Sequence, residues 1–231
     1  MMTSSKNLYR RYTSLPVLID MLVSKRITIV GYDSWADAND RYSMDSYKSL
    51  NPKVTFLGAY CVAKSTNQTY HQWKVFADGQ SGVCIVFDAS KFENFCASLD
   101  STRYICRDVK YIPYMSSKNE QDKKLHEAFV DVDRCNLPFA KRSGFSAEKE
   151  FRILYSSTDR DEKIHHIDFD TSMIAAVILS PSLPDGLLSS VKSTLKSIDG
   201  CPKSVTKARL LDSRAWQQSL DRYAAKTLGS A

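Results

Sequence analysis

A run of apolar residues, SGVCIVFD at positions 81–88, places the first limit on the fold. Short apolar runs bounded by turn-forming residues are typical of buried strands. A second run, VTFLGAYCV at 54–62, predicts a central strand. Segments with helical spacing alternate with such strands along the chain. The sequence therefore predicts a mixed α/β or α+β domain.

The segment at 8–25 combines a predicted strand with a predicted helix. LYRRYT at 8–13 has strand character, and the apolar residues of 14–25 recur at helical spacing behind a serine that can cap the helix. Arg11 and Thr13 share one face of that strand. Backbone N–H groups at a helix start can hold an anion, and arginine can bind a phosphate. The alternative interpretation is an arginine paired with a carboxylate.

Composition limits the class of protein. The 231 residues suit one domain spanning 1–231, and the net charge of +6 is mild for that length. No apolar stretch is long enough to span a membrane, and the N-terminal residues lack the apolar core of a signal peptide, so we expect a cytoplasmic protein. The six cysteines include no C-x-x-C pair. They indicate reduced thiols rather than a disulfide framework or a zinc site.

Two glutamates at the start of a predicted strand raise a functional question. In SAEKEFRILY at 146–155, Glu148, Glu150 and Arg152 alternate with apolar residues. Alternate side chains of a strand share a face, so these three are expected to point the same way. The face is either solvated and charged, or it forms the floor of a site.

Other polar or aromatic clusters have two interpretations each. Asp37 and Asp40 can hold Mg²⁺, but we favour hydrogen bonds that fix a loop. Tyr70 and Trp73 lie within one predicted helical turn, either as core anchors or as an aromatic wall for a planar ligand. The adjacent histidines at 165–166 would face opposite ways on a strand, so no metal site is predicted.

The motifs at 11–15 (RYTSL), 35–40 (WADAND), 70–88 and 148–153 (EKEFRI) together resemble a family of uncharacterised bacterial proteins, a domain of unknown function. That resemblance runs nearly end to end. It implies no activity.

The order of the same parts also resembles the ADP-ribosyltransferase superfamily. Those enzymes open with a strand carrying His or Arg and then a helix, and they close with a glutamate at the start of a late strand. The resemblance implies an α+β domain with a mainly antiparallel sheet flanked by helices. It implies NAD as the bound substrate, held by Arg11 and Thr13, with Tyr70 or Trp73 stacked on nicotinamide.

The same resemblance assigns roles to the two glutamates. Glu150 would stabilise the ribosyl cation, and Glu148 would activate the acceptor. Such an enzyme would modify a protein or a nucleic acid, as an intracellular toxin or phage-defence effector restrained by an antitoxin or inhibitor protein. The middle motif of the superfamily is not clear in this sequence, and Tyr12 replaces its usual glycine.

Two other functions stay open. Basic residues are frequent in the C-terminal third, which would suit a component that binds nucleic acid or protein without catalysis. Its last helix, at 213–228, carries Trp216, Leu220 and Tyr223 at helical spacing and is expected to be amphipathic. The third function is a metal-dependent nuclease or hydrolase that would use the acids named above.

Overall fold

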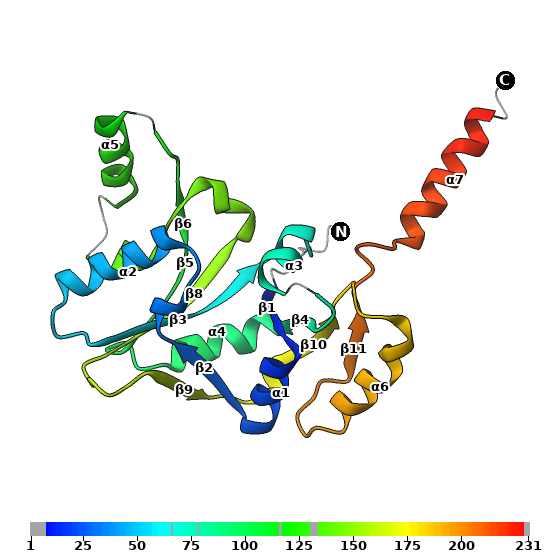
Figure 1. Cartoon of the computed structure of the whole chain (residues 1–231), viewed down its shortest axis with the longest axis horizontal. Coiled ribbons are helices and arrows are strands. Elements are labelled where there is room, and N and C mark those ends of the chain that lie inside the picture. The colour runs from blue at the N-terminus through cyan, green and yellow to red at the C-terminus, as the bar shows by residue number, and fades with distance from the viewer. Residues whose placement is uncertain (1–7, 66, 78, 116, 130–133, 229–231) are drawn as a thin grey trace.

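The computed structural model describes residues 8–65, 67–77, 79–115, 117–129 and 134–228. Its main element is a seven-stranded sheet with strand order β11-β10-β4-β1-β3-β8-β5 (Figure 1). All neighbouring pairs in it are antiparallel except β10 and β11. Its strands are β1 (Tyr9–Ser14), β3 (Phe56–Lys64), β4 (Gly82–Phe87), β5 (Tyr104–Asp108), β8 (Glu150–Ser157), β10 (Ile174–Leu179) and β11 (Ser204–Lys207).

Two small sheets complete the strands. One is an antiparallel pair, and the other is a parallel pair. Their strands are β2 (Arg26–Val30) with β9 (Ile164–Asp168), and β6 (Lys110–Ile112) with β7 (Ala140–Arg142).

Helices flank the sheet, so the predicted α+β fold with a mainly antiparallel sheet is confirmed. The α-helices are α1 (Leu15–Ser24), α2 (Ala38–Leu50), α3 (Tyr70–Phe76), α4 (Ala89–Ser98), α5 (Lys118–Phe129), α6 (Asp185–Lys196) and α7 (Arg214–Leu228). The 3₁₀ helices are η1 (Tyr32–Ser34), η2 (Arg134–Phe139), η3 (Ser143–Glu148) and η4 (Thr171–Met173). Among the described helices, none has the length and apolarity needed to cross a bilayer.

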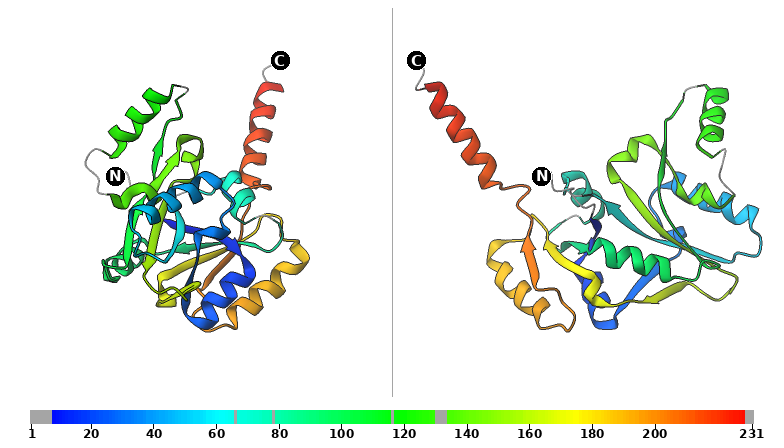
Figure 2. Two further views of the ribbon diagram at one scale, coloured as in Figure 1. Left: turned by 60° about the vertical axis from the view of Figure 1, so that its left-hand side comes forward. Right: turned by 180° about the vertical axis from the view of Figure 1, so that it is seen from behind.

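Different helices cover the two faces of the sheet. On one face, Val83, Ile85 and Phe87 of β4 pack with α1, α4, α6 and the β2–β9 pair. On the other face, Cys84 and Val86 of the same strand pack with α3, while α2 and η2 cover the part formed by β3 and β8. In the left view of Figure 2, α1 and α6 lie below the sheet and α3 lies above it. β4 is apolar throughout because both of its faces are buried.

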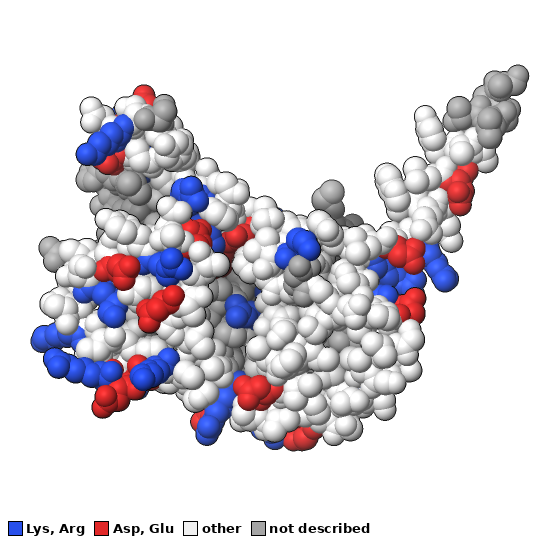
Figure 3. All heavy atoms as spheres, in the orientation of Figure 1, with Lys and Arg blue, Asp and Glu red and all other residues white. Residues whose placement is uncertain are grey.

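The sheet opens between its two central strands. β1 pairs with β3 only at Tyr9 and Arg10, whereas all six of its residues pair with β4. Past that point β3 takes another neighbour, because Gly58 forms a bridge with Gly31 at the end of β2. A Cβ at Gly58 would lie 2.5 Å from the carbonyl oxygen of Val30, so only glycine permits this approach. Figure 3 shows a groove at the centre of the face that is turned to the viewer in Figure 1, with basic and acidic side chains on the walls of the groove.

Two parts of the chain differ from the sequence expectation. The segment RYICRDVKYI at 103–112 has the strand character that predicts one strand, but Val109 interrupts it and donates its N–H to the carbonyl oxygen of Glu150. β5 and β6 therefore belong to different sheets. The amphipathic helix α7 projects from the rest of the chain (Figures 1 and 2), with Trp216 65% and Leu220 50% exposed. Its apolar stripe is present, but it does not join the core.

Candidate functional site

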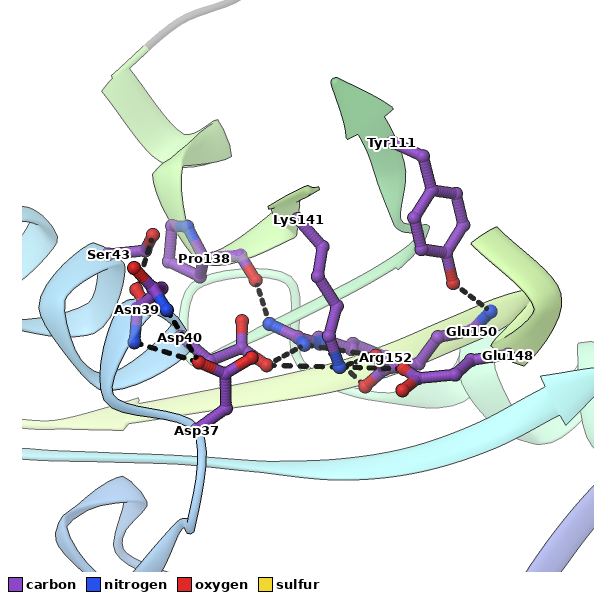
Figure 4. Close-up of polar contacts among 10 residues, drawn as sticks. All are labelled: Asp37, Asn39, Asp40, Ser43, Tyr111, Pro138, Lys141, Glu148, Glu150 and Arg152. Carbon is purple, nitrogen blue, oxygen red and sulfur yellow. Dashed lines mark hydrogen bonds and ion pairs between the residues drawn. The ribbon is translucent and has the colours of Figure 1, made fainter. Parts of the chain in front are cut away.

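Five charged side chains meet on the face of the sheet that α2 covers. They come from four elements: Asp40 from α2, Lys141 from β7, Glu148 from the end of η3, and Glu150 and Arg152 from β8 (Figure 4). All except Lys141 are buried, and the Lys141 side chain is only 10% exposed. A solvated, charged strand face is therefore excluded for these residues.

Arg152 is the centre of this cluster. Its Nε and Nη2 donate to the two carboxylate oxygens of Glu150 at 2.7 and 3.0 Å. Nη2 also donates to Asp40 Oδ2 at 2.8 Å, and Nη1 donates to the carbonyl oxygen of Pro138 at 2.6 Å. The guanidinium carbon lies 5.1 Å from the centre of the Trp35 ring. This planar fork fixes the Glu150 carboxylate in one orientation.

Lys141 joins the three acids from the opposite side. Its Nζ lies 2.6 Å from Glu148 Oε2, 3.3 Å from Asp40 Oδ2 and 3.4 Å from Glu150 Oε2. The predicted common strand face was wrong for Glu148, which ends a 3₁₀ helix, followed by Lys149 with a φ of 46°. Glu148 nevertheless reaches the cluster, because Lys141 bridges it to Glu150.

The environment shifts the pKa values of Glu148 and Glu150 in opposite directions. Burial alone would raise the pKa of Glu150, but the charge and hydrogen bonds of Arg152, with Lys141 beyond it, lower that pKa to about 2. Burial raises the pKa of Glu148, because Lys141 only partly offsets it and the other carboxylates add to the rise. Two carboxyl groups with separated pKa values can take different roles, one as a fixed anion and one as a proton acceptor.

Stability should therefore fall in acid, and Glu150 should carry much of the loss. Its pKa in the folded chain, about 2, lies below the ordinary value of 4.5, so its contribution is present above pH 4.5 and is lost as pH falls through 2. The contribution of Glu148 to stability changes with pH in the opposite direction, because its raised pKa means that the folded chain binds its proton more tightly than the unfolded chain does. Urea unfolding between about pH 2 and 6 would measure this. Glu150→Gln should flatten the curve, and an unchanged slope would contradict the assignment.

The cluster is linked to the opening between β1 and β3 through Cys61. The Cys61 thiol hydrogen-bonds to Glu150. The backbone carbonyl oxygen of Cys61 accepts a hydrogen bond from Arg11 Nη1 at 2.8 Å. Arg11 thus spans the opening, with its guanidinium carbon 4.9 Å from the centre of the Tyr60 ring. Its buried Nε has no hydrogen-bond partner in the described part of the chain. An anion or a polar oxygen entering the opening would supply one.

The other residues predicted to bind NAD are placed differently. Thr13 is buried in β1, opposite Val83. Trp73 is 3% exposed, packs edge-on against Tyr12 and donates Nε1 to Gln68 at 3.0 Å, as expected of a core anchor. Tyr70 is 57% exposed at the start of α3. Of the two aromatic residues predicted to stack on nicotinamide, only Tyr70 therefore presents its ring at the surface.

The two aspartates of the WADAND motif have separate roles. Asp37 accepts from the backbone N–H of Asn39 at 2.8 Å and caps α2, in agreement with the predicted loop-fixing role. Asp40 does not fix a loop; it lies in the charged cluster, and its buried Oδ1 has no partner among the described residues. Beside it is a pocket of about 220 Å³, whose lining includes Ser43, Tyr114 and Lys141. Sequence reasoning missed Lys141 and misjudged Asp40.

The cluster does not suit a cation. Its three carboxylates already surround one ammonium and one guanidinium group. In the part of the chain that the structure describes, no group of three or more His, Cys, Asp or Glu side chains is placed to hold a metal ion. This arrangement gives no support to the metal-dependent nuclease or hydrolase.

The comparisons with known proteins agree with the first of the two resemblances. A family model described as "Protein of unknown function (DUF2971)" matches residues 72–153, and the predicted resemblance to an uncharacterised family is confirmed over that segment. No curated protein matches the chain.

Two solved structures share a similar arrangement. They are Thermus sp. 2.9 DarT in complex with carba-NAD+, with a TM-score of 0.39, and the same protein in complex with ADP-ribosylated ssDNA, with a TM-score of 0.37. Each is 10% identical and aligns with 90% of this chain and 97% of its own.

Proposed function

We propose that this chain is an NAD-dependent ADP-ribosyltransferase. The observation that carries the proposal is the buried carboxylate of Glu150, held ionised by Arg152 and connected through Cys61 to the opening that Arg11 spans. The resemblance of the segments around Arg11 and Glu150 to the superfamily supports it, and Cys61 of β3 hydrogen-bonds to both residues.

The chemistry requires a fixed anion near the ribose. When the nicotinamide–ribose bond of NAD breaks, positive charge develops on the ribose, as in glycoside hydrolysis. A preorganised carboxylate stabilises that charge more strongly than it stabilises the ground state. Glu150 meets the requirement because Arg152 fixes its orientation and lowers its pKa to about 2, which keeps it ionised at neutral pH.

Arg11 and Tyr70 would hold the substrate. The unpartnered Nε of Arg11 can donate to a diphosphate or ribose oxygen. The exposed Tyr70 ring offers a flat surface for nicotinamide. Thr13 and Trp73, which the resemblance also assigned to NAD, would support β1 and α3 from inside the core.

Glu148 would serve the acceptor. The raised pKa of its carboxyl group makes it the better proton acceptor of the pair. The balanced reaction joins the ADP-ribosyl group to the acceptor, releases nicotinamide and transfers the acceptor's proton to Glu148. The acceptor would be a protein or nucleic acid, and the biological setting would be a toxin or phage-defence effector that an inhibitor protein restrains.

Nicotinamide release from NAD tests this proposal. We expect the purified chain to release nicotinamide and Glu150→Gln to lose about 100-fold or more of the rate, as loss of one preorganised charge-stabilising group typically does. Glu148→Gln should reduce transfer to an acceptor more than it reduces release. The matched control is Glu93→Gln, a glutamate on α4 at the opposite sheet face, which should retain activity.

The outcomes separate the three functions. Thermal unfolding of each variant, measured alongside, distinguishes a lost activity from a lost fold. Absence of nicotinamide release by the native chain, with and without cell lysate, would overturn the transferase and favour a binding component, whose affinity would fall steeply with salt. A nuclease or hydrolase activity that EDTA abolishes would favour the metal-dependent enzyme.

A further inference from the structure

Two cysteines from different elements lie together at one edge of the main sheet. Cys96 belongs to α4 and Cys106 to β5, the edge strand. Their thiols hydrogen-bond to each other, and Cys106 Sγ also lies 4.0 Å from the carbonyl oxygen of Cys96. The pair is separate from the charged cluster, because it packs against the core on the opposite face of the sheet.

The pair is open to small reagents. Both cysteines are half-buried rather than enclosed. They line a pocket of about 520 Å³ whose other walls include Glu93, Ser101 and Arg107. Such a pocket admits a small polar molecule to the sulfur atoms.

The other cysteines with described side chains do not combine a neighbouring thiol with access from a pocket. Cys61 and Cys84 lie inside the sheet, and burial raises the pKa of both thiols. Cys201 is half-buried like the pair, but its thiol hydrogen-bonds to the carbonyl oxygen of Pro202 at 3.7 Å rather than to another thiol. The side chain of Cys135 is outside the described part of the chain.

We propose that Cys96 and Cys106 are a modification site, at which hydrogen peroxide forms a reversible intramolecular disulfide. In the first step the Cys106 thiolate attacks one peroxide oxygen, giving a sulfenic acid and hydroxide. In the second step the Cys96 sulfur attacks the Cys106 sulfur, forming the S–S bond and releasing water. The peroxide is reduced by two electrons, and the two thiols are oxidised.

The order of the two sulfur atoms follows from their hydrogen bond. The Cys96 thiol stabilises the Cys106 thiolate, which lowers the pKa of Cys106, while the same interaction and burial raise the pKa of Cys96. The thiolate is the form that attacks peroxide. The finished bridge would join α4 to β5, which pairs with β8 beside the charged cluster.

Peptide mapping tests the proposal directly. Trypsin cleaves after Lys91, Arg103 and Arg107, so each cysteine falls on its own peptide, 92–103 or 104–107. After peroxide treatment of the native chain, we expect these two peptides to be joined, and a thiol reductant should separate them. Cys96→Ser and Cys106→Ser should each abolish the joined species, while the matched variant Cys201→Ser should form it as the native chain does.

Trapping the sulfenic acid tests the order of attack. With Cys96→Ser, a sulfenic-acid reagent should label peptide 104–107, whereas with Cys106→Ser peptide 92–103 should stay unlabelled. Two results would overturn the proposal: the joined peptides are absent after peroxide treatment of the native chain, or the disulfide that forms contains one of the other cysteines instead.

Discussion

Replacing Arg152 by methionine should destabilise the chain by about 3–5 kcal/mol, the cost of removing one partner from a buried ion pair. Arg152 is 1% exposed and donates to Glu150, Asp40 and the carbonyl oxygen of Pro138. Methionine fills similar space but leaves the Glu150 carboxylate with Lys141, at 3.4 Å, as its only charged partner among the described residues. Urea unfolding followed by circular dichroism would measure the loss.

Two further variants make that experiment specific. Arg26→Met removes an arginine whose ion pair with Asp168 is exposed, with side chains 53% and 87% accessible, so its effect should be small. Adding Glu150→Gln to Arg152→Met should recover part of the stability, because the uncompensated carboxylate is then gone. If Arg152→Met proved as mild as Arg26→Met, the cluster would not contribute to stability in the way its contacts indicate.

Alanine at Gly82 should cost about 2 kcal/mol or more, since the new methyl group would overlap the main chain. An ideal Cβ at Gly82 would lie 2.0 Å from the carbonyl oxygen of Ala77 and 2.9 Å from its carbon. Gly82 begins β4, pairs with Ser14 and accepts a hydrogen bond from the N–H of Ser180 at 2.8 Å. Relief of the overlap would therefore displace the start of a central strand.

A second glycine supplies the comparison. A Cβ at Gly144 would meet nothing within 4 Å, so Gly144→Ala should leave the unfolding midpoint almost unchanged. Thermal unfolding of both variants would show the difference. Equal midpoints would mean that the turn before β4 rearranges at little cost.

Much of the fold could be predicted because its signals are local. The apolar run at 81–88 and the helical spacing after Ser14 each report the environment of their own segment. The break at Val109 had no such signal, because it depends on a hydrogen bond to Glu150, far along the chain. Likewise, Trp216 and Leu220 show that α7 is amphipathic, but spacing cannot say whether a partner covers the apolar side.

The site was predictable only in part, for a similar reason. The positions of Glu148 and Glu150 before an apolar strand were visible in the sequence. Arg152 was expected on the same face, but Asp40 was not expected beside it, since Asp40 and Arg152 are 112 residues apart and meet only when α2 covers the sheet. One signal was available: an arginine inside an apolar strand has five N–H donors to satisfy, more than one glutamate can accept.

The position of β1 has a consequence for synthesis on the ribosome. This first strand lies at the middle of the sheet, and its partners are β3 and β4, which are translated later. In a nascent chain Tyr9 and Arg10 can pair with β3, but Arg11–Ser14 stay unpaired until β4 has left the exit tunnel. Contacts between segments so distant in sequence form slowly, and unpaired strands are prone to aggregate meanwhile. Early chaperone binding at this strand would protect the centre of the sheet while the remaining strands are made.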